Sequence, residues 1–238
     1  MKKELLVFTI LAGLAGASQA EPTEDLANAA KKLSSAKNYT WSSSRAFGDR
    51  EPRTTTGQMG SGGHTLLKIP MRDSSIEVLI RNEKAAIKTD AGWQLASSEA
   101  KGDENRRLRF LARMATGYEA PTKRVAELIA GIADLKVEEG AYHGTLTEDA
   151  AKKLLTFRRR GRGQGGEQRE PPAINGASGS VKIFIKDGVL TKYELNVRGK
   201  VTFNDQERDM NRTTTVEFSK VDSTSFVIAE EAAGLLAP

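Results

Sequence analysis

Residues 181–198 read VKIFIKDGVLTKYELNVR, two runs of alternating side chains on either side of Asp187-Gly188. Val181, Ile183 and Ile185 occupy every second position of the first run. Such alternation predicts a strand with one face against a core and the other in water. Asp-Gly favours a tight hairpin, because both residues tolerate the positive φ of a two-residue turn. The stretch therefore predicts paired antiparallel strands.

Further short segments rich in β-branched and aromatic residues predict strands, and segments with apolar residues at i, i+3, i+4 and i+7 predict helices. The expected strands are 38–47, 54–59, 64–69, 75–81, 85–89, 93–96, 135–137, 141–146, 181–186, 192–198, 200–204 and 212–219. The expected helices are 24–36, 103–115, 121–132 and 147–156. Strands at both ends with helices between them predict an α+β domain, in which the helices cover one face of a single antiparallel sheet.

The first twenty residues have the layout of a secretory signal peptide. Lys2 and Lys3 precede an apolar run over 5–17, and Ser18-Gln19-Ala20 offers small residues for cleavage. The run is shorter than the ~20 apolar residues that span a bilayer, although a retained anchor is the alternative. We therefore expect residues 1–20 to be removed and residues 21–238 to form one domain in the periplasm or outside the cell.

Composition narrows the chemistry of the chain. It has no cysteine, which excludes disulfides, thiolate metal sites and an acylated N-terminal cysteine. The net charge is +5, and much of the excess lies in Arg158, Arg159, Arg160 and Arg162. Residues 158–178 are rich in Gly, Arg, Pro and Gln without apolar periodicity, so we expect a long exposed loop there.

Four features together resemble the LolA, LolB and LppX group of exported lipid and lipoprotein carriers. They are an amphipathic helix leading into LSSAKNY (33–39), a strand ending in Lys68-Ile69-Pro70, the turn Asn82-Glu83-Lys84, and KDGVL (186–190). The resemblance implies an unclosed antiparallel barrel in which helices form a lid over an apolar cavity. In that group an arginine often precedes the proline, where this chain has Ile69.

The two central helices supply the candidate walls of such a cavity. Their apolar residues are Leu108, Leu111, Met114, Val125, Leu128, Ile129 and Ile132. They either line a cavity, with adaptable Met side chains suited to variable acyl chains, or fill an ordinary core. Trp41 and Trp93, in the expected strands, are candidates either for ligand contact or for packing.

The arginine cluster at 158–162 is a candidate for contact with anionic lipid headgroups, against the alternative of a solvated loop without a partner. It also resembles an RNA-binding arginine-glycine segment, a reading that export disfavours, so we expect no nucleic-acid partner. The only histidines, His64 and His143, are isolated in sequence, and no acidic residue has a recognisable catalytic setting. We therefore expect no enzyme, metal or cofactor, with a hydrolase as a minor alternative.

The leading hypothesis is a monomeric carrier in the cell envelope that shields a lipid or an acylated protein from water and contacts a membrane surface or an envelope protein. The alternative is a sensory or protein-interaction module on the same scaffold, with a filled core and no ligand cavity. A hollow or a solid interior distinguishes the two hypotheses.

Overall fold

The computed structural model describes residues 21–60, 62–71, 74–97, 106–156, 173–203 and 206–237. The expected signal peptide and the arginine cluster at 158–162 lie outside these ranges. The strands are β1 (Tyr39–Phe47), β2 (Arg53–Met59), β3 (Thr65–Pro70), β4 (Ser75–Arg81), β5 (Lys84–Thr89), β6 (Gly92–Leu95), β7 (Ile132–Glu138), β8 (Ala141–Leu146), β9 (Ala173–Lys186), β10 (Val189–Phe203) and β11 (Gln206–Ser219). The helices are α1 (Pro22–Ser34), α2 (Arg106–Thr116), α3 (Pro121–Ala130), α4 (Glu148–Leu155) and α5 (Glu230–Leu235).

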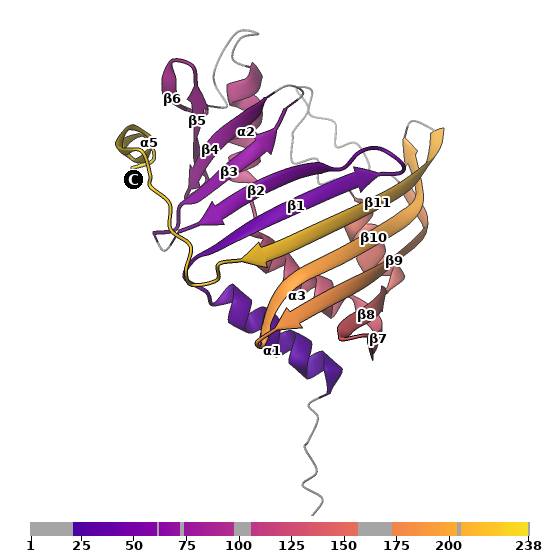
Figure 1. The fold of residues 1–238 in the computed structure, drawn as a ribbon. Helices are drawn as coiled ribbons and strands as arrows, with labels where there is room; N and C mark the ends of the chain where they lie inside the picture. Colours follow the sequence, from indigo (N-terminus) through magenta and orange to yellow (C-terminus); the bar gives the residue numbers. More distant parts are fainter. Residues whose placement is uncertain are drawn as a thin grey trace, which may run out of the picture.

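These strands form one bent antiparallel sheet in the order β6-β5-β4-β3-β2-β1-β11-β10-β9-β8-β7 (Figure 1). The pairing of β1 with β11 joins the two strand series at the centre, with Trp41 opposite Phe218. The sheet is not closed, because β6 and β7 are its edges. The expected unclosed antiparallel α+β fold is confirmed. The β9–β10 hairpin has φ values of 53° at Asp187 and 70° at Gly188, as a two-residue turn requires.

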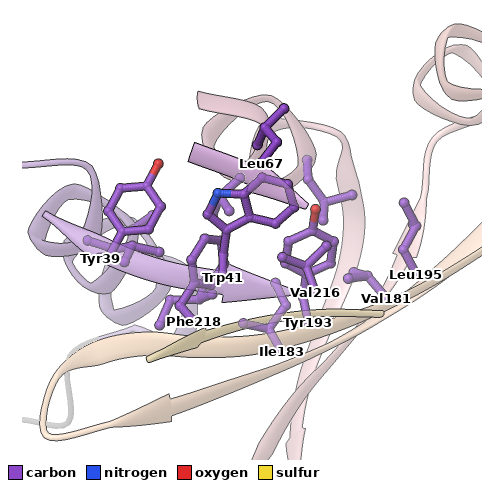
Figure 2. Packing of buried hydrophobic residues seen from close by; sticks show 14 of the residues in the cluster. Tyr39, Trp41, Leu67, Val181, Ile183, Tyr193, Leu195, Val216 and Phe218 are labelled. Carbon is purple, nitrogen blue, oxygen red and sulfur yellow. The ribbon is translucent and has the colours of Figure 1, made fainter. Parts of the chain in front are cut away.

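The inner face of the sheet carries the main hydrophobic cluster, which includes Trp41, Tyr193 and Val216 (Figure 2). Four helices cover this face: α1 packs on β10 and α3, α2 on β5, and α4 on β9 and β10. Leu26 and Leu33 of α1 are fully buried there. The expectation that the helices cover one face is confirmed for α1 to α4.

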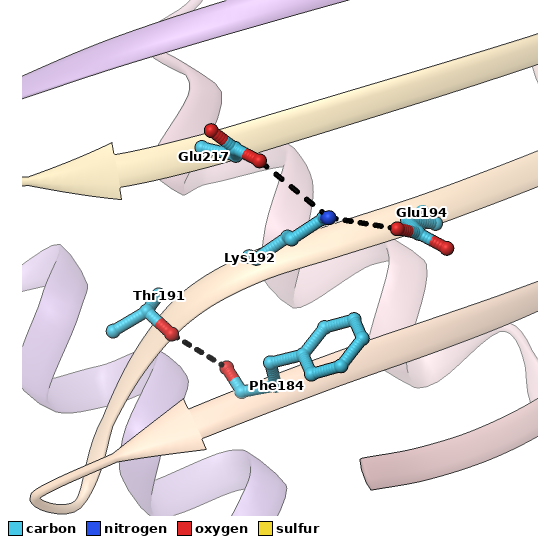
Figure 3. A network of polar contacts seen from close by, with 5 residues as sticks. All are labelled: Phe184, Thr191, Lys192, Glu194 and Glu217. Atoms are coloured by element: carbon cyan, nitrogen blue, oxygen red, sulfur yellow. Dashed lines mark hydrogen bonds and ion pairs between the residues drawn. The ribbon is translucent and has the colours of Figure 1, made fainter.

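The outer face of the central strands is polar. Lys192 Nζ lies 2.8 Å from Glu194 and 3.5 Å from Glu217, and 5.4 Å from the centre of the Phe184 ring (Figure 3). Thr191 Oγ1 donates a hydrogen bond to the Phe184 carbonyl at 3.3 Å. Exposed ion pairs of this kind stabilise a fold by only about 0–1 kcal/mol. These contacts show that this face of the sheet is exposed to solvent.

Helix α5 was not expected, and it covers the opposite face at the β4–β6 end. Ala232 and Leu236 pack there on Leu79 and Ala86. Lys84 Nζ donates to the Ala237 carbonyl at 2.8 Å and fastens the end of the chain. The three consecutive apolar residues 78–80 were a signal for it, because a strand with one solvated face has no reason to place leucine at 79.

Two further boundaries were wrong. Ile132 was assigned to a helix stripe, but α3 ends at Ala130 and Ile132 begins β7. Gly131 separates them and lies so close to α4 that a Cβ there would sit 2.6 Å from Ala150 Cβ. Residues 173–178 were expected to be loop but form the start of β9. On the neighbouring β10 a small residue is needed, because a Cβ on Gly199 would lie 2.8 Å from Leu155 of α4.

Candidate functional site

A cavity of about 850 Å³ lies on the inner face between β1–β3, β10–β11 and the connection from α2 to α3. Buried Trp41, Leu67 and Val216 contribute to its floor. Exposed Arg50 and Arg53 stand where the cavity opens to solvent. The cavity is therefore apolar at one end and cationic at the other.

Trp41 is placed at the floor by a glycine on the neighbouring strand. Gly57 pairs with Trp41 across β1 and β2, and a Cβ there would lie 2.4 Å from the indole ring. The ring thus lies against bare backbone, between Tyr39 and Tyr193 along the inner face (Figure 2). Its Nε1 is buried and faces the hydroxyl of Tyr118, which also lines the cavity.

Three arginines from distant parts of the chain gather at this face, and we call them the arginine triad: Arg45, Arg124 and Arg212. Arg45 of β1 and Arg124 of α3 line the cavity. Arg212 of β11 pairs with the cavity-lining Phe47, which puts it on the same face. Arg212 Nη2 donates to the Leu154 carbonyl at 2.6 Å, while its Nε is buried without a partner in the described part of the chain.

The triad is a cluster of like charges in a partly dry site. Burial, and after it repulsion from Arg45 and Arg124, lower the pKa of Arg212 to about 10. The pKa of Arg45 is also lowered, first by the protein around it and then by Arg124. Arg45 is nevertheless exposed to solvent at the cavity. None of these shifts has a carboxylate as its cause, so the site holds unbalanced positive charge.

Sequence-based candidates fall into three places. Trp41 and Met114 line the cavity. Leu111, Val125 and Leu128 are buried in the main cluster, and Leu108, Ile129 and Ile132 pack against its edge. Trp93 lies on the opposite face, near α5. Ligand contact by any of these residues stays a prediction, and so does headgroup contact by Arg158, Arg159, Arg160 and Arg162.

Sequence reasoning missed the arginine triad, although a signal was present. Positions 41, 43, 45 and 47 of β1 share one face, as do 212, 214, 216 and 218 of β11. A strand face that carries Trp41 and Phe218 is the buried one, so Arg45 and Arg212 had to point inward. An inward arginine on an apolar face is unusual enough to be a functional candidate. Arg124 lies on an amphipathic helix, where charged residues are expected on the solvent face, so no such signal marked it.

Burial raises the pKa of Tyr193, which lines the cavity, from its ordinary 10 to about 12, against the pull of Arg124 and Arg45. The folded protein therefore retains this proton while the unfolded chain loses it. We expect the stability contribution of Tyr193 to be complete below pH 10 and to fall by about 2–3 kcal/mol as the pH rises to 12. The pKa of Arg212 is lowered on folding, so this residue makes the protein more stable as the pH rises over the same range. The measurement therefore compares urea unfolding of the wild type with that of Tyr193→Phe at each pH, so that the contribution of Arg212 cancels. A difference in the free energy of unfolding between the two proteins that does not change with pH would contradict the prediction.

The described residues hold no group of three or more His, Cys, Asp or Glu placed to bind a metal ion. Within the same ranges, no helix has the length and apolar character needed to span a bilayer. The side chains that line the cavity can make apolar contacts at the floor. Its arginine and tyrosine side chains can form hydrogen bonds, and the arginines can attract negative charge.

No protein-family model matches the chain, and no curated protein matches it. Among solved structures, a LolA superfamily protein from Nitrosomonas europaea aligns over 84% of this chain and 95% of that one, with 9% identity and a TM-score of 0.27. The MucA/MucB complex of Pseudomonas aeruginosa aligns over 86% of this chain and 98% of that one, with 11% identity and a TM-score of 0.27. Both TM-scores are too low to show a shared fold, so the resemblance to the LolA group stays a prediction from sequence motifs.

Proposed function

We propose that this protein is an envelope carrier that holds the acyl chain of a lipid or an acylated protein in the cavity. The observation that supports the proposal is the cavity itself, whose volume of about 850 Å³ lies within the ~300–1,000 Å³ of small-molecule sites. Its floor is made of tryptophan and aliphatic side chains. Each CH₂ group moved from water onto such a surface contributes about 0.8 kcal/mol, which is sufficient to retain an acyl chain without covalent chemistry.

The roof of the cavity suggests how a ligand enters and leaves. Gly117, Tyr118 and Glu119 of the α2–α3 connection line the cavity together with Met114. Helix α2 packs on β5 and α3 on α1, and the connection itself touches the sheet through Tyr118, which packs on the main cluster and hydrogen-bonds to Thr65 and Trp41. We propose that the connection moves aside for loading and release while the sheet stays fixed. The place of action, the cell envelope, rests on the expected signal peptide.

The two tryptophans provide a direct test, because Trp41 lies in the cavity and Trp93 on the opposite face. In a Trp93→Phe variant, Trp41 is the only tryptophan. We expect dibromostearate, whose bromines quench tryptophan on contact, to reduce the Trp41 fluorescence to a saturating plateau below its micellar concentration.

The matched control is Trp41→Phe, which leaves Trp93 as the reporter. Dibromostearate should leave the fluorescence of Trp93 nearly unchanged. Equal quenching of the two variants would mean unspecific adsorption, and no quenching of Trp41 would favour an interaction module without a ligand. Either result would reject the carrier.

A further inference from the structure

We propose that the ligand is an anionic amphiphile, and that Arg45 and Arg124 bind its carboxylate or phosphate group while Arg212 adds positive potential beside them. This inference rests on the proposed function and narrows it to one class of ligand. The apolar tail would lie on the floor at Trp41, and the anionic group would lie nearer the opening of the cavity.

The order of side chains along β1 gives the site its direction. Trp41, Ser43, Arg45 and Phe47 all line the cavity. With a rise of about 3.4 Å per residue, Arg45 lies roughly 14 Å along the strand from Trp41. An amphiphile lying along β1 would thus place its tail on the indole and its charged group beside a guanidinium. A wholly apolar ligand would leave that guanidinium partly desolvated and unpaired.

Charge balance within the site supports an anion in particular. Four arginines line the cavity, Arg45, Arg50, Arg53 and Arg124, against two glutamates, Glu51 and Glu119. Glu119 is 3.9 Å from Arg124 Nε and is shared with Lys123, a longer contact than the ~2.7–2.9 Å of a strong charged hydrogen bond. Arg45 has neither an ion pair nor a hydrogen bond with any residue of the described ranges. Its guanidinium is free to receive an incoming oxyanion.

The repulsion among the three arginines also supports an anionic ligand. Water screens part of this repulsion, since Arg45 is exposed and the Arg124 side chain is 54% exposed. Arg124 helps to lower the pKa of Arg45, and Arg45 and Arg124 help to lower the pKa of Arg212. An anion between Arg45 and Arg124 would relieve this repulsion, so the empty site carries a cost that binding removes. The uncapped N-terminus of α3, where Pro121 lines the cavity, adds a partial positive charge of the same sign.

The experiment compares dibromostearate with its methyl ester, which has the same tail and no charge, by quenching of Trp41 in the Trp93→Phe background. We expect the acid to bind at least tenfold more tightly than the ester, and added salt to weaken the acid alone. Arg45→Gln should weaken binding of the acid about tenfold and leave the ester unchanged. Because Arg45 has no partner in the described residues, Arg45→Gln should melt at the same temperature as the parent or higher.

Arg198→Gln is the matched control, since it removes the same charge from the outer face, where Arg198 Nε contacts Ser178 Oγ at 3.1 Å. It should leave both affinities unchanged. A third probe, octadecyl phosphate, separates a phosphate ligand from a carboxylate ligand by which of the two binds more tightly. Acid and ester binding equally well would overturn the anionic subsite and leave the carrier intact. If neither quenched Trp41, the proposed function itself would fail.

Arg124→Gln keeps the test decisive if Arg45→Gln is poorly folded. Its guanidinium contacts only the roof residue Glu119 at 3.9 Å among the described ion pairs, so its loss leaves the sheet unaltered. We expect the same selective loss of acid binding as for Arg45→Gln. Preference for the acid that survives in both arginine variants would assign the anionic group to another part of the protein and reject this subsite.

Discussion

Replacing Gly57 by alanine should displace Trp41 and abolish ligand binding at the cavity floor. The new Cβ would lie 2.4 Å from the indole, a distance that cannot persist, so the ring would have to shift from its place at the cavity floor. Overpacking of this kind costs typically about 1–3 kcal/mol. Urea unfolding measures the loss of stability, and a shift of the Trp41 emission in the Trp93→Phe background reports that the ring has moved.

A double-mutant cycle separates this contact from a general intolerance of the strand. Trp41→Leu removes the ring, so Gly57→Ala should cost far less in that background than in the wild type. Gly234→Ala is the control, because no atom lies within 4 Å of a Cβ placed there. If Gly57→Ala were equally costly with and without the indole, the clash would not be the cause.

Leu33→Ala should destabilise the protein by about 2–5 kcal/mol, because the side chain is fully buried and its removal leaves a void. Leu33 belongs to α1, which packs on both α3 and β10. Helix α3 is also linked to the sheet by the hydroxyls of Tyr39 and Thr122, 3.3 Å apart. Loosening α1 should therefore weaken acid binding, which uses Arg124 of α3, by more than it weakens binding of the ester.

Leu95→Ala serves as the comparison, since Leu95 is 44% exposed at the β6 edge. The same loss of atoms there should cost less than about 1 kcal/mol and leave ligand binding unaltered. Thermal or urea unfolding of the two variants side by side checks the difference. A small cost for Leu33→Ala would mean that α1 is loosely docked and does not support the roof.

Local chemistry made most of the fold predictable. The hairpin at Asp187-Gly188 and the helix start at Pro121 were correct because each depends on a few neighbouring residues. Thr147 likewise begins α4 by accepting a hydrogen bond from the Ala150 amide at 3.2 Å. Residues 173–178 were wrongly predicted as loop, because their mostly small or polar side chains have the composition of a loop.

The candidate site was much less predictable than the fold, because it depends on contacts between distant segments. Arg45 and Arg212 become neighbours only through the register of β1 with β11, which no local pattern encodes. The run of arginines at 158–162 was predicted as a contact site instead, because a cluster of neighbouring residues can be recognised in a sequence. A cluster formed by distant residues cannot. The helix stripes were recognised as apolar, but Leu111 and Val125 fill the core, whereas Met114 reaches the cavity.

The central pairing of β1 with β11 has a consequence for how the protein acquires its activity. Because the two strands lie near opposite ends of the chain, their contact closes a loop of almost the whole domain, and such high contact order slows folding. Neither strand series can complete the sheet alone. A chain still emerging from a ribosome would have Arg45 but not its neighbour Arg212, so the arginine triad assembles only after the last strand has been synthesised.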